Sequence, residues 1–214
     1  MSEQSTRTVE RALALLANVC EAGSTTLADA SRAVELAPST ALRLLRTLEA
    51  SGFVRKDDDG YRAGPRLVQL GAQALGHESL IDLCHDEMVA LERETGESVY
   101  LSVPGHADTA LYIGIVEGSH SVRHANWVGR TVALDGSAAG AALTGATPDA
   151  GFVVVERGIE RDVTAIAAPI SAAGRIVAAL SLLVPSYRMP ESAALAHGAL
   201  LAAAADRLSA GLTP

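Results

Sequence analysis

Apolar residues recur at intervals of three and four along the first fifty positions of the chain, the pattern of amphipathic helices that share a core. The first such stretch covers residues 7–22 and ends before Gly23, a residue type that commonly terminates helices. Thr26 and Asp29 have the spacing of a capping box and predict the start of a second, short helix. Two helices therefore precede the most informative segment, residues 37–62.

Residues 38–50 predict a third helix with one apolar half and one polar half. Pro38 suits the first helical position, where its missing N–H costs nothing. Leucines dominate the apolar half, and the polar half carries Ser39, Thr40, Arg43, Arg46 and Thr47. Hydroxyl and guanidinium groups on such a face are suited to contact base edges and phosphates in the major groove.

A short hairpin follows this helix. Residues 53–56 predict a strand, Asp59-Gly60 a tight turn, and residues 61–63 the returning strand. The strands carry the basic residues Arg55, Lys56 and Arg62, whereas the three aspartates at 57–59 would repel phosphate. This order of elements is that of a winged helix-turn-helix, with double-stranded DNA as the expected partner. The alternative is a three-helix bundle that binds protein, and the basic wing beside a polar helix face argues against it.

The rest of the chain passes from helical to alternating periodicity. Residues 66–76, after the break at Gly64-Pro65, and residues 79–95 predict two amphipathic helices. Alternation then predicts strands near 97–103, 111–115, 121–127, 130–134, 151–156, 162–171 and 175–183. Helices are expected at 138–143 and from 190 to about 209. We expect an α+β protein with a DNA-binding domain at 1–64, a linker helix at 65–78 and a sensor-like domain at 79–214.

Charge is unevenly distributed along the 214 residues. The net charge of −8 argues at first against DNA binding, but residues 1–64 hold 8 basic and 9 acidic groups, whereas residues 65–214 hold 9 and 16. The acidic excess thus lies outside the module expected to bind DNA. Because that module is nearly neutral, one copy would bind weakly. We expect a homodimer or tetramer, with Leu67 and Leu70 of the linker helix as candidate contacts.

The sequence gives no sign of a membrane span. No apolar run reaches the roughly 18–20 residues that a span needs, and the N-terminus is too polar for a signal peptide. Cys20 and Cys84 each lie on an expected apolar helix face, so both are expected to be buried free thiols. These features fit a cytoplasmic protein.

Residues that could suggest an enzyme do not form a catalytic set. Cys84 and His85 are adjacent, so on a helix they would point about 100° apart and could not act as nucleophile and base. His120 and His124 are spaced to share one face of a strand or loop, but they lack a third ligand for a metal ion. We therefore expect no enzyme, no metal and no other cofactor.

The glycine-rich run 135–140 lacks the lysine of a phosphate-binding loop. Its better use is at a helix N-terminus, where Ser137 and the N–H groups of Ala138 and Ala139 would hold an anion. A plain structural cap at Ser137 is the alternative. The aromatic residues Tyr100, Tyr112 and Trp127 are expected either in a pocket wall or in the core.

Several segments of the chain resemble the IclR (isocitrate lyase regulator) family of bacterial transcription factors. They are VERALALLANVCEAG, STALRLLRTLEASGFVRKDDDGYRAG, GPRLVQLGAQAL, ETGESVYLSVP and IAAPISAAGRIVAALSL. The resemblance covers almost the whole chain. It implies a C-terminal domain of GAF-like fold that binds a small-molecule effector, and assembly into dimers or tetramers.

Departures from the family pattern bear on the effector. Family members carry a helical segment where this chain has only residues 145–150, so the effector domain is truncated. The resemblance places the effector pocket at Val155, Ala165, Ser181 and Leu183, and the helix start at Ser137, Ala138 and Ala139 is expected to face it. Three of these are apolar where the family often has polar groups, and each unpaired oxygen of a small polar acid would cost about 1–3 kcal/mol there. We expect an acid with an apolar or aromatic body, or alternatively a cavity that has closed.

The combined interpretation is a sequence-specific DNA-binding regulator whose DNA affinity is modulated by a small-molecule effector. Two alternatives remain open, an enzyme fused to a degenerate DNA module and an adaptor that binds other proteins.

Overall fold

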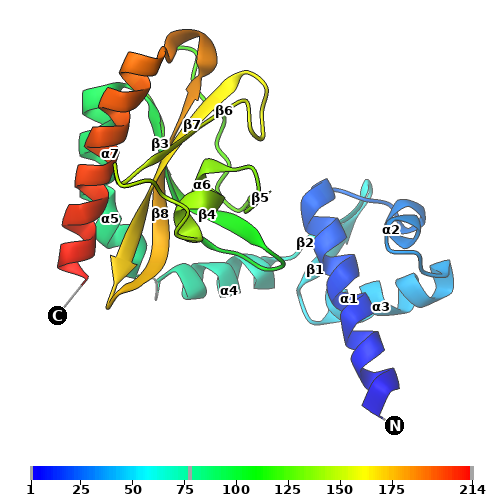
Figure 1. Cartoon of the computed structure of the whole chain (residues 1–214). Coiled ribbons are helices and arrows are strands. Elements are labelled where there is room, and N and C mark those ends of the chain that lie inside the picture. The colour runs from blue at the N-terminus through cyan, green and yellow to red at the C-terminus, as the bar shows by residue number, and fades with distance from the viewer. Residues whose placement is uncertain (1, 77–78, 213–214) are drawn as a thin grey trace. The chain divides into compact units, whose positions relative to one another are not determined.

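The computed structural model describes residues 2–76 and 79–212. The chain divides into two compact units, Met1–Glu78 and Ser79–Pro214. Figure 1 shows the first as a small helical unit with a two-stranded hairpin and the second as a larger unit built around a sheet. The whole is an α+β protein, as the sequence predicts.

The first unit is a winged helix-turn-helix. Its elements are α1 (Ser2–Ala22), α2 (Leu27–Ala33), α3 (Pro38–Ala50), β1 (Val54–Asp57), β2 (Gly60–Ala63) and α4 (Pro65–Gly76). Leu15, Val19 and Leu45 are fully buried where α1 and α3 pack together. The predicted cap of α2 is present, because Thr26 Oγ1 accepts a 3.2 Å hydrogen bond from the N–H of Asp29.

The wing turns one residue earlier than the sequence predicts. Asp57 pairs with Gly60, so Asp58 and Asp59 form the two-residue loop instead of Asp59-Gly60. Gly60 is needed for a different reason, since a Cβ at this position would lie 2.5 Å from the carbonyl oxygen of Thr25. That oxygen accepts a 2.8 Å hydrogen bond from the N–H of Tyr61, which ties the wing to the residue before the cap of α2.

One of the two cysteine predictions is wrong. Cys20 is exposed, because the buried face of α1 passes through Val19 and the next residue points about 100° away. Cys84 is fully buried, as expected. Its burial raises the pKa of the thiol to about 11, so it is protonated at neutral pH.

The second unit is a six-stranded antiparallel sheet with helices on both faces. Its helices are α5 (Ser79–Thr95), α6 (Ala138–Leu143), the short 3-10 helix η1 (Ser186–Arg188) and α7 (Glu191–Gly211). Its strands are β3 (Ser98–Pro104), β4 (Thr109–Val116), β5 (Thr131–Ala133), β6 (Val153–Glu156), β7 (Val163–Ala172) and β8 (Arg175–Pro185). They lie in the order β5-β4-β3-β8-β7-β6. In Figure 1, α5 and α7 cover one face and α6 lies on the other.

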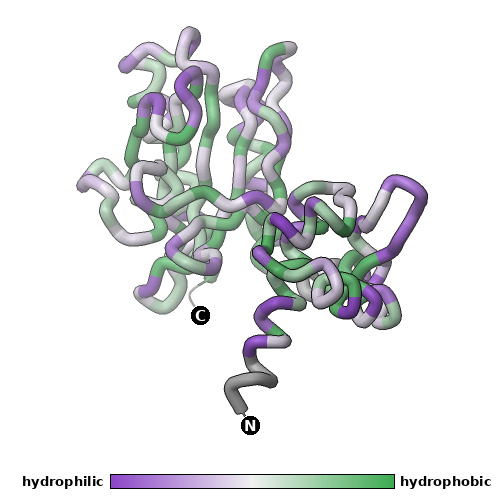
Figure 2. Tube along the Cα trace, turned by 90° about the vertical axis from the view of Figure 1, so that its right-hand side faces the viewer, coloured by the Kyte–Doolittle hydropathy of each residue, from purple (hydrophilic) through white to green (hydrophobic). Residues whose placement is uncertain are grey.

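The two faces of this sheet contribute to different cores, because neighbouring residues of a strand point to opposite sides. Leu101 and Leu182 are buried with α5 and α7. Tyr100 and Leu183, each one position away, are buried on the α6 side. Figure 2 shows the result as hydrophobic strands through the middle of the unit and hydrophilic stretches in its loops.

The predicted strand at 121–127 is wrong. Residues 117–130 form the irregular connection between β4 and the edge strand β5, which pairs antiparallel with β4. His124 and Trp127 are buried there by ring contacts with Tyr100 and Tyr112, not by pairing in the sheet. Over residues 2–76 and 79–212, no helix is both long and apolar enough to cross a membrane.

Candidate functional site: a DNA-binding face and a ligand cavity

The polar half of α3 is open to solvent, while Leu44 and Leu45 on its other half are buried. A shallow hollow on the exposed side is lined by Ser39, Leu42, Arg43, Arg46, Thr47, Ala50 and Ser51. Thr40 lies outside this hollow and is half-buried. Within the described part of the chain, the side chains of Arg43 and Arg46 have no hydrogen-bond or ion-pair partner, although the Arg43 carbonyl accepts a 3.1 Å bond from Thr47 Oγ1. Both guanidinium groups are therefore available to a ligand.

The basic side chains of the wing are less available to DNA phosphates than the sequence suggests. Arg62 lies 3.5 Å from the carboxylate of Asp57 and 3.4 Å from that of Asp59, and Arg55 lies 3.9 Å from Asp57. The ammonium group of Lys56 lies 5.9 Å from the ring centroid of Tyr61. The predicted phosphate contacts at Arg55 and Arg62 are thus paired with the wing's own aspartates. A phosphate would have to replace these carboxylates.

One cavity of the second unit brings all seven predicted effector residues together. Ser137, Ala138, Ala139, Val155, Ala165, Ser181 and Leu183 line the same space between α6 and strands β6, β7 and β8. The register explains this, since Val155 pairs with Ala165 and Ala165 pairs with Leu183 in one row across the sheet. The lining atoms enclose about 410 Å³ including the open mouth, but the centre of a water molecule can reach only about 20 Å³. The cavity would have to widen to accommodate a ligand with an aromatic ring.

Ser137 caps α6 with its hydroxyl group. Its Oγ accepts a 3.0 Å hydrogen bond from the N–H of Gly140 and donates a 2.6 Å bond to the carbonyl of Ala133. The side chain is therefore committed to the fold, which is the structural alternative named above. The N–H groups of Ala138 and Ala139 have no partner among the described residues, as first-turn amides of a helix lack intrahelical acceptors.

Ser181 is the least satisfied polar residue of the cavity wall. The side chain lies on β8, only 1% of the residue is exposed, and its Oγ has no hydrogen-bond partner among the described residues. Leaving a buried hydroxyl unpaired costs about 1–3 kcal/mol. A ligand oxygen that reached Ser181 would remove this cost.

The cavity wall contains seven further residues, Tyr112, His124, Trp127, Gly158, Ile159, Glu160 and Val163. Tyr112 and Trp127, expected either in a pocket wall or in the core, line the pocket, whereas the other five were not predicted as lining residues. The loop 157–162 could have been inferred from the β6–β7 hairpin, because the strands on either side carry Val155 and Ala165. No comparable feature of the sequence indicated that His124 lines the cavity.

His120 and His124 do not share a site, so the expectation that they face the same way is wrong. His120 Nε2 lies 3.6 Å from Glu97 Oε1, whereas His124 Nε2 lies 3.3 Å from Glu160 Oε2. In the irregular loop between them, the regular alternation of a strand does not apply. Over the described residues, no three His, Cys, Asp or Glu side chains are grouped in a way that could hold a metal ion.

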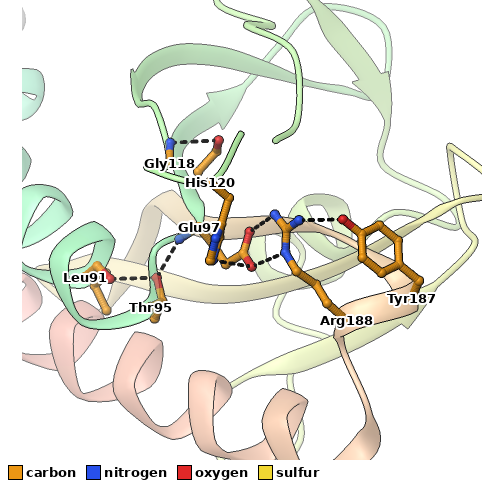
Figure 3. A network of polar contacts seen from close by, with 8 residues as sticks. Leu91, Thr95, Glu97, Gly118, His120, Tyr187 and Arg188 are labelled. Carbon is orange, nitrogen blue, oxygen red and sulfur yellow. Dashed lines mark hydrogen bonds and ion pairs between the residues drawn. The ribbon is translucent and has the colours of Figure 1, made fainter. Parts of the chain in front are cut away.

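A separate polar cluster surrounds Glu97 at the start of β3 (Figure 3). Arg188 of η1 donates two 2.7 Å hydrogen bonds to the Glu97 carboxylate, whose side chain is 3% exposed. The N–H of Glu97 donates to Thr95 Oγ1 at 3.2 Å, and Tyr187 lies beside Arg188. None of these residues lines the cavity, so the cluster joins elements of the fold rather than forming part of the site.

A winged helix-turn-helix with a free polar helix face, joined in one chain to a sheet domain with a partly polar cavity, is the architecture of ligand-responsive transcriptional regulators. Residues 8–58 match the family model of the IclR helix-turn-helix domain, and residues 72–155 match that of the C-terminal domain of bacterial transcriptional regulator IclR. The chain belongs to the IclR family of bacterial transcriptional regulators.

Curated relatives support the assignment over different lengths. The chain is 31% identical to the transcriptional repressor IclR of Escherichia coli K12 over 141 residues, 64% of this chain and 52% of that protein. It thus spans about half the length of this relative. It is 26% identical to the regulator BhcR of Paracoccus denitrificans over 246 residues, 97% of this chain and 88% of that protein. Because that alignment is longer than 214 residues, BhcR has residues with no counterpart here.

Solved structures share the fold. A regulator of this family from Brucella abortus has a TM-score of 0.81 at 18% identity, with 95% of this chain and 91% of that chain covered. An IclR homologue from Microbacterium hydrocarbonoxydans, solved with 4-hydroxybenzoate, has a TM-score of 0.77 at 22% identity, with 96% and 98% covered. At these identities the likeness concerns the fold alone.

Proposed function

We propose that this protein binds an operator through two or more copies of its winged helix, and that an effector in the sheet-domain cavity changes its DNA affinity. The DNA-contacting residues are Ser39, Thr40, Arg43, Arg46 and Thr47 on α3, with Arg55, Lys56 and Arg62 on the wing. The free guanidinium groups of Arg43 and Arg46 on an exposed helix face support this assignment.

The effector in this proposal is an acid with an apolar or aromatic body. The observation that carries it is a mostly apolar cavity with three unpaired hydrogen-bond donors, the N–H groups of Ala138 and Ala139 and the hydroxyl of Ser181. These groups suit a carboxylate, and Val155, Ala165 and Leu183 suit the apolar body. The homologue solved with 4-hydroxybenzoate provides a chemical precedent in another member of the fold.

The same proposal makes the protein a cytoplasmic regulator and not an enzyme. Buried Cys84 carries a protonated thiol, and its neighbour His85 is exposed, so the two do not form a reactive pair. The nucleophile and base of a hydrolase would have to lie within hydrogen-bond reach.

The test is DNA binding to the region upstream of the protein's own gene, measured by fluorescence anisotropy at several salt concentrations. We expect specific binding whose affinity falls as salt rises, because Lys and Arg contacts release counterions from DNA. A thermal-shift screen of aromatic and short aliphatic acids should then identify ligands that stabilise the sheet unit. Absence of specific DNA binding would contradict the regulator; absence of any stabilising acid would contradict only the effector.

A further inference from the structure

His124 lies at the point where the ligand cavity meets a wider surface hollow. His124, Glu160 and Val163 line both spaces, whereas Ser181, Ala138 and Ala139 line the inner cavity only. The His124 side chain is 3% exposed, and its ring centroid lies 4.7 Å from that of Trp127 in an edge-to-face arrangement. The cavity therefore has unpaired donors in its interior and the His124–Glu160 pair at its mouth.

The hydrogen bonds of Tyr100 determine which nitrogen of His124 carries the proton. The Tyr100 hydroxyl contacts the carbonyl oxygen of Ala125 and lies 2.7 Å from His124 Nδ1. A carbonyl can only accept, so the single hydroxyl proton goes to Ala125. Nδ1–H then donates to the Tyr100 oxygen, and the neutral ring is left with a lone pair on Nε2.

This arrangement places two acceptors opposite each other without a donor. Nε2 has no hydrogen-bond partner among the described residues, and the Oε2 atom of Glu160, 3.3 Å away, belongs to a group that only accepts when ionised. Burial lowers the pKa of His124, although Glu160 opposes this shift, so the neutral ring is favoured at neutral pH. The Glu160 side chain is 46% exposed and can move to admit a ligand.

We propose that the mouth of the cavity binds a hydrogen-bond donor of the effector, a hydroxyl or amino group that lies between His124 Nε2 and the Glu160 carboxylate. The inference rests on the proposed acidic effector and extends it, because the ligand must carry the donor at the end remote from its acid group. A second carboxylate at that end is excluded, since it would face Glu160.

Four benzoates that differ only at the para position separate the possibilities. Trp127 is the chain's single tryptophan and lines the cavity, so its fluorescence reports binding to the full-length protein. We expect 4-hydroxybenzoate and 4-aminobenzoate to bind about tenfold more tightly than benzoate, because each can donate a hydrogen bond. 4-Methoxybenzoate has a similar shape but no donor and should bind no more tightly than benzoate.

Two variants and one control connect this preference to the mouth. His124→Phe keeps a ring of similar size and removes Nε2, and Glu160→Gln provides an amide that can itself donate to Nε2. Both should reduce the preference for 4-hydroxybenzoate over benzoate to less than about threefold, if half or more of the hydrogen-bond free energy is lost. Glu160 is partly exposed, so its replacement avoids the folding problem that a buried substitution can cause. His120→Phe changes a histidine that lies outside the cavity and should retain the preference.

The outcomes are distinct. Equal affinity for all four acids, or a preference that survives both His124→Phe and Glu160→Gln, overturns the donor site and leaves the acidic effector standing. If benzoate and its three derivatives all fail to bind, the aromatic-acid effector is wrong and the donor site falls with it.

Discussion

Two arginine–glutamate pairs in the sheet unit have the same geometry but differ in burial. Arg188 holds Glu97, whose side chain is 3% exposed, whereas Arg207 holds Glu87, whose side chain is 25% exposed beside an arginine that is 59% exposed. Both arginines donate two hydrogen bonds of 2.9 Å or less. Comparing the two pairs therefore separates the effect of solvent exposure on their stabilising free energy from the effect of geometry.

We expect Glu97→Ala to lower the free energy of unfolding of the sheet unit by about 3 kcal/mol, because it leaves Arg188 with an uncompensated, partly buried charge. Glu87→Ala should lower it by at most about 1 kcal/mol, since solvent already screens that pair. Urea unfolding followed by Trp127 fluorescence measures both. Similar losses in the two variants would show that burial does not control the strength of these pairs.

Arg43 lies on the exposed face of α3, opposite the buried leucines. Arg43→Ala should cost about 1–3 kcal/mol in specific operator binding while thermal stability is retained, because the side chain takes no part in the core. Anisotropy titration against operator and unrelated DNA measures the loss. Arg93→Ala removes an exposed arginine from α5 and serves as the control. If Arg43→Ala binds the operator like the wild type, the recognition-helix assignment fails.

At the scale of elements, the sequence predicts correctly those features of the fold that depend on residues close together in the chain. The period of α3, with Pro38 at its start, and the turn between β7 and β8 depend on neighbouring residues only. For the segment 117–130 the prediction from local pattern is wrong, because the structure of this segment depends on residues that are distant in sequence. His124 and Trp127 acquire their places from Tyr100 and Tyr112, and His124 is 24 positions away from Tyr100 in sequence. The role of His124 at the cavity mouth therefore could not be read from alternation or spacing.

The same limit applies to the candidate site. The strand residues inferred from the family pattern, Val155, Ala165 and Leu183, meet at one cavity because strand register aligns them, and register follows from turns and alternation. The hydrogen bonds that commit Ser137 to the cap of α6 depend on how α6 meets residues 133 and 134. The sequence allowed a structural cap at Ser137 but did not decide between that cap and a ligand contact.

The position of α6 depends on a glycine. A Cβ at residue 140 would lie 1.9 Å from the carbonyl oxygen of Leu134, so Gly140→Ala must move the helix that carries Ala138 and Ala139. We expect a loss of more than about tenfold in binding of 4-hydroxybenzoate, measured by Trp127 fluorescence, since at least one hydrogen bond to the ligand would be broken.

Gly71→Ala is the matched control, because a Cβ at residue 71 of α4 meets no atom within 4 Å. Alanine is favoured over glycine inside a helix by roughly 0.5–1 kcal/mol, so this variant should be as stable as the wild type or more so. Undiminished ligand binding by Gly140→Ala would show that α6 does not position the ligand.

At the scale of the whole molecule, the first unit exposes apolar side chains that one copy does not cover. Leu13 on α1 is 59% exposed, and Val68 and Leu70 on α4 are 71% and 39% exposed. These residues support the proposed dimer. We expect light scattering to give at least a dimer at micromolar concentration and Leu13→Glu with Leu70→Glu to shift it toward the monomer, because a buried charge opposes association.

Leu195→Glu, at an exposed leucine of α7, is the control for this shift and should retain the dimer. A wild-type protein that is monomeric and still protects a single operator half-site would contradict the requirement for pairing. Nearly neutral charge on residues 1–64 makes that result unexpected, since weak electrostatic attraction leaves little affinity for one module.

Regulation requires that the cavity and the DNA-binding face be coupled in free energy, and such coupling is reciprocal. If the effector changes operator affinity, the operator must change effector affinity by the same factor, within the roughly 5–150-fold range common for allosteric proteins.

Titrating 4-hydroxybenzoate with and without saturating operator DNA, by Trp127 fluorescence, measures the effect of the operator on effector affinity. Titrating operator DNA by fluorescence anisotropy, with and without the acid, measures the effect of the effector on operator affinity. In Arg43→Ala, which should bind the operator more weakly, the same DNA concentration should change the affinity for the acid less than it does in the wild type. Equal effector affinity in the free and operator-bound wild type would show that the two units act independently.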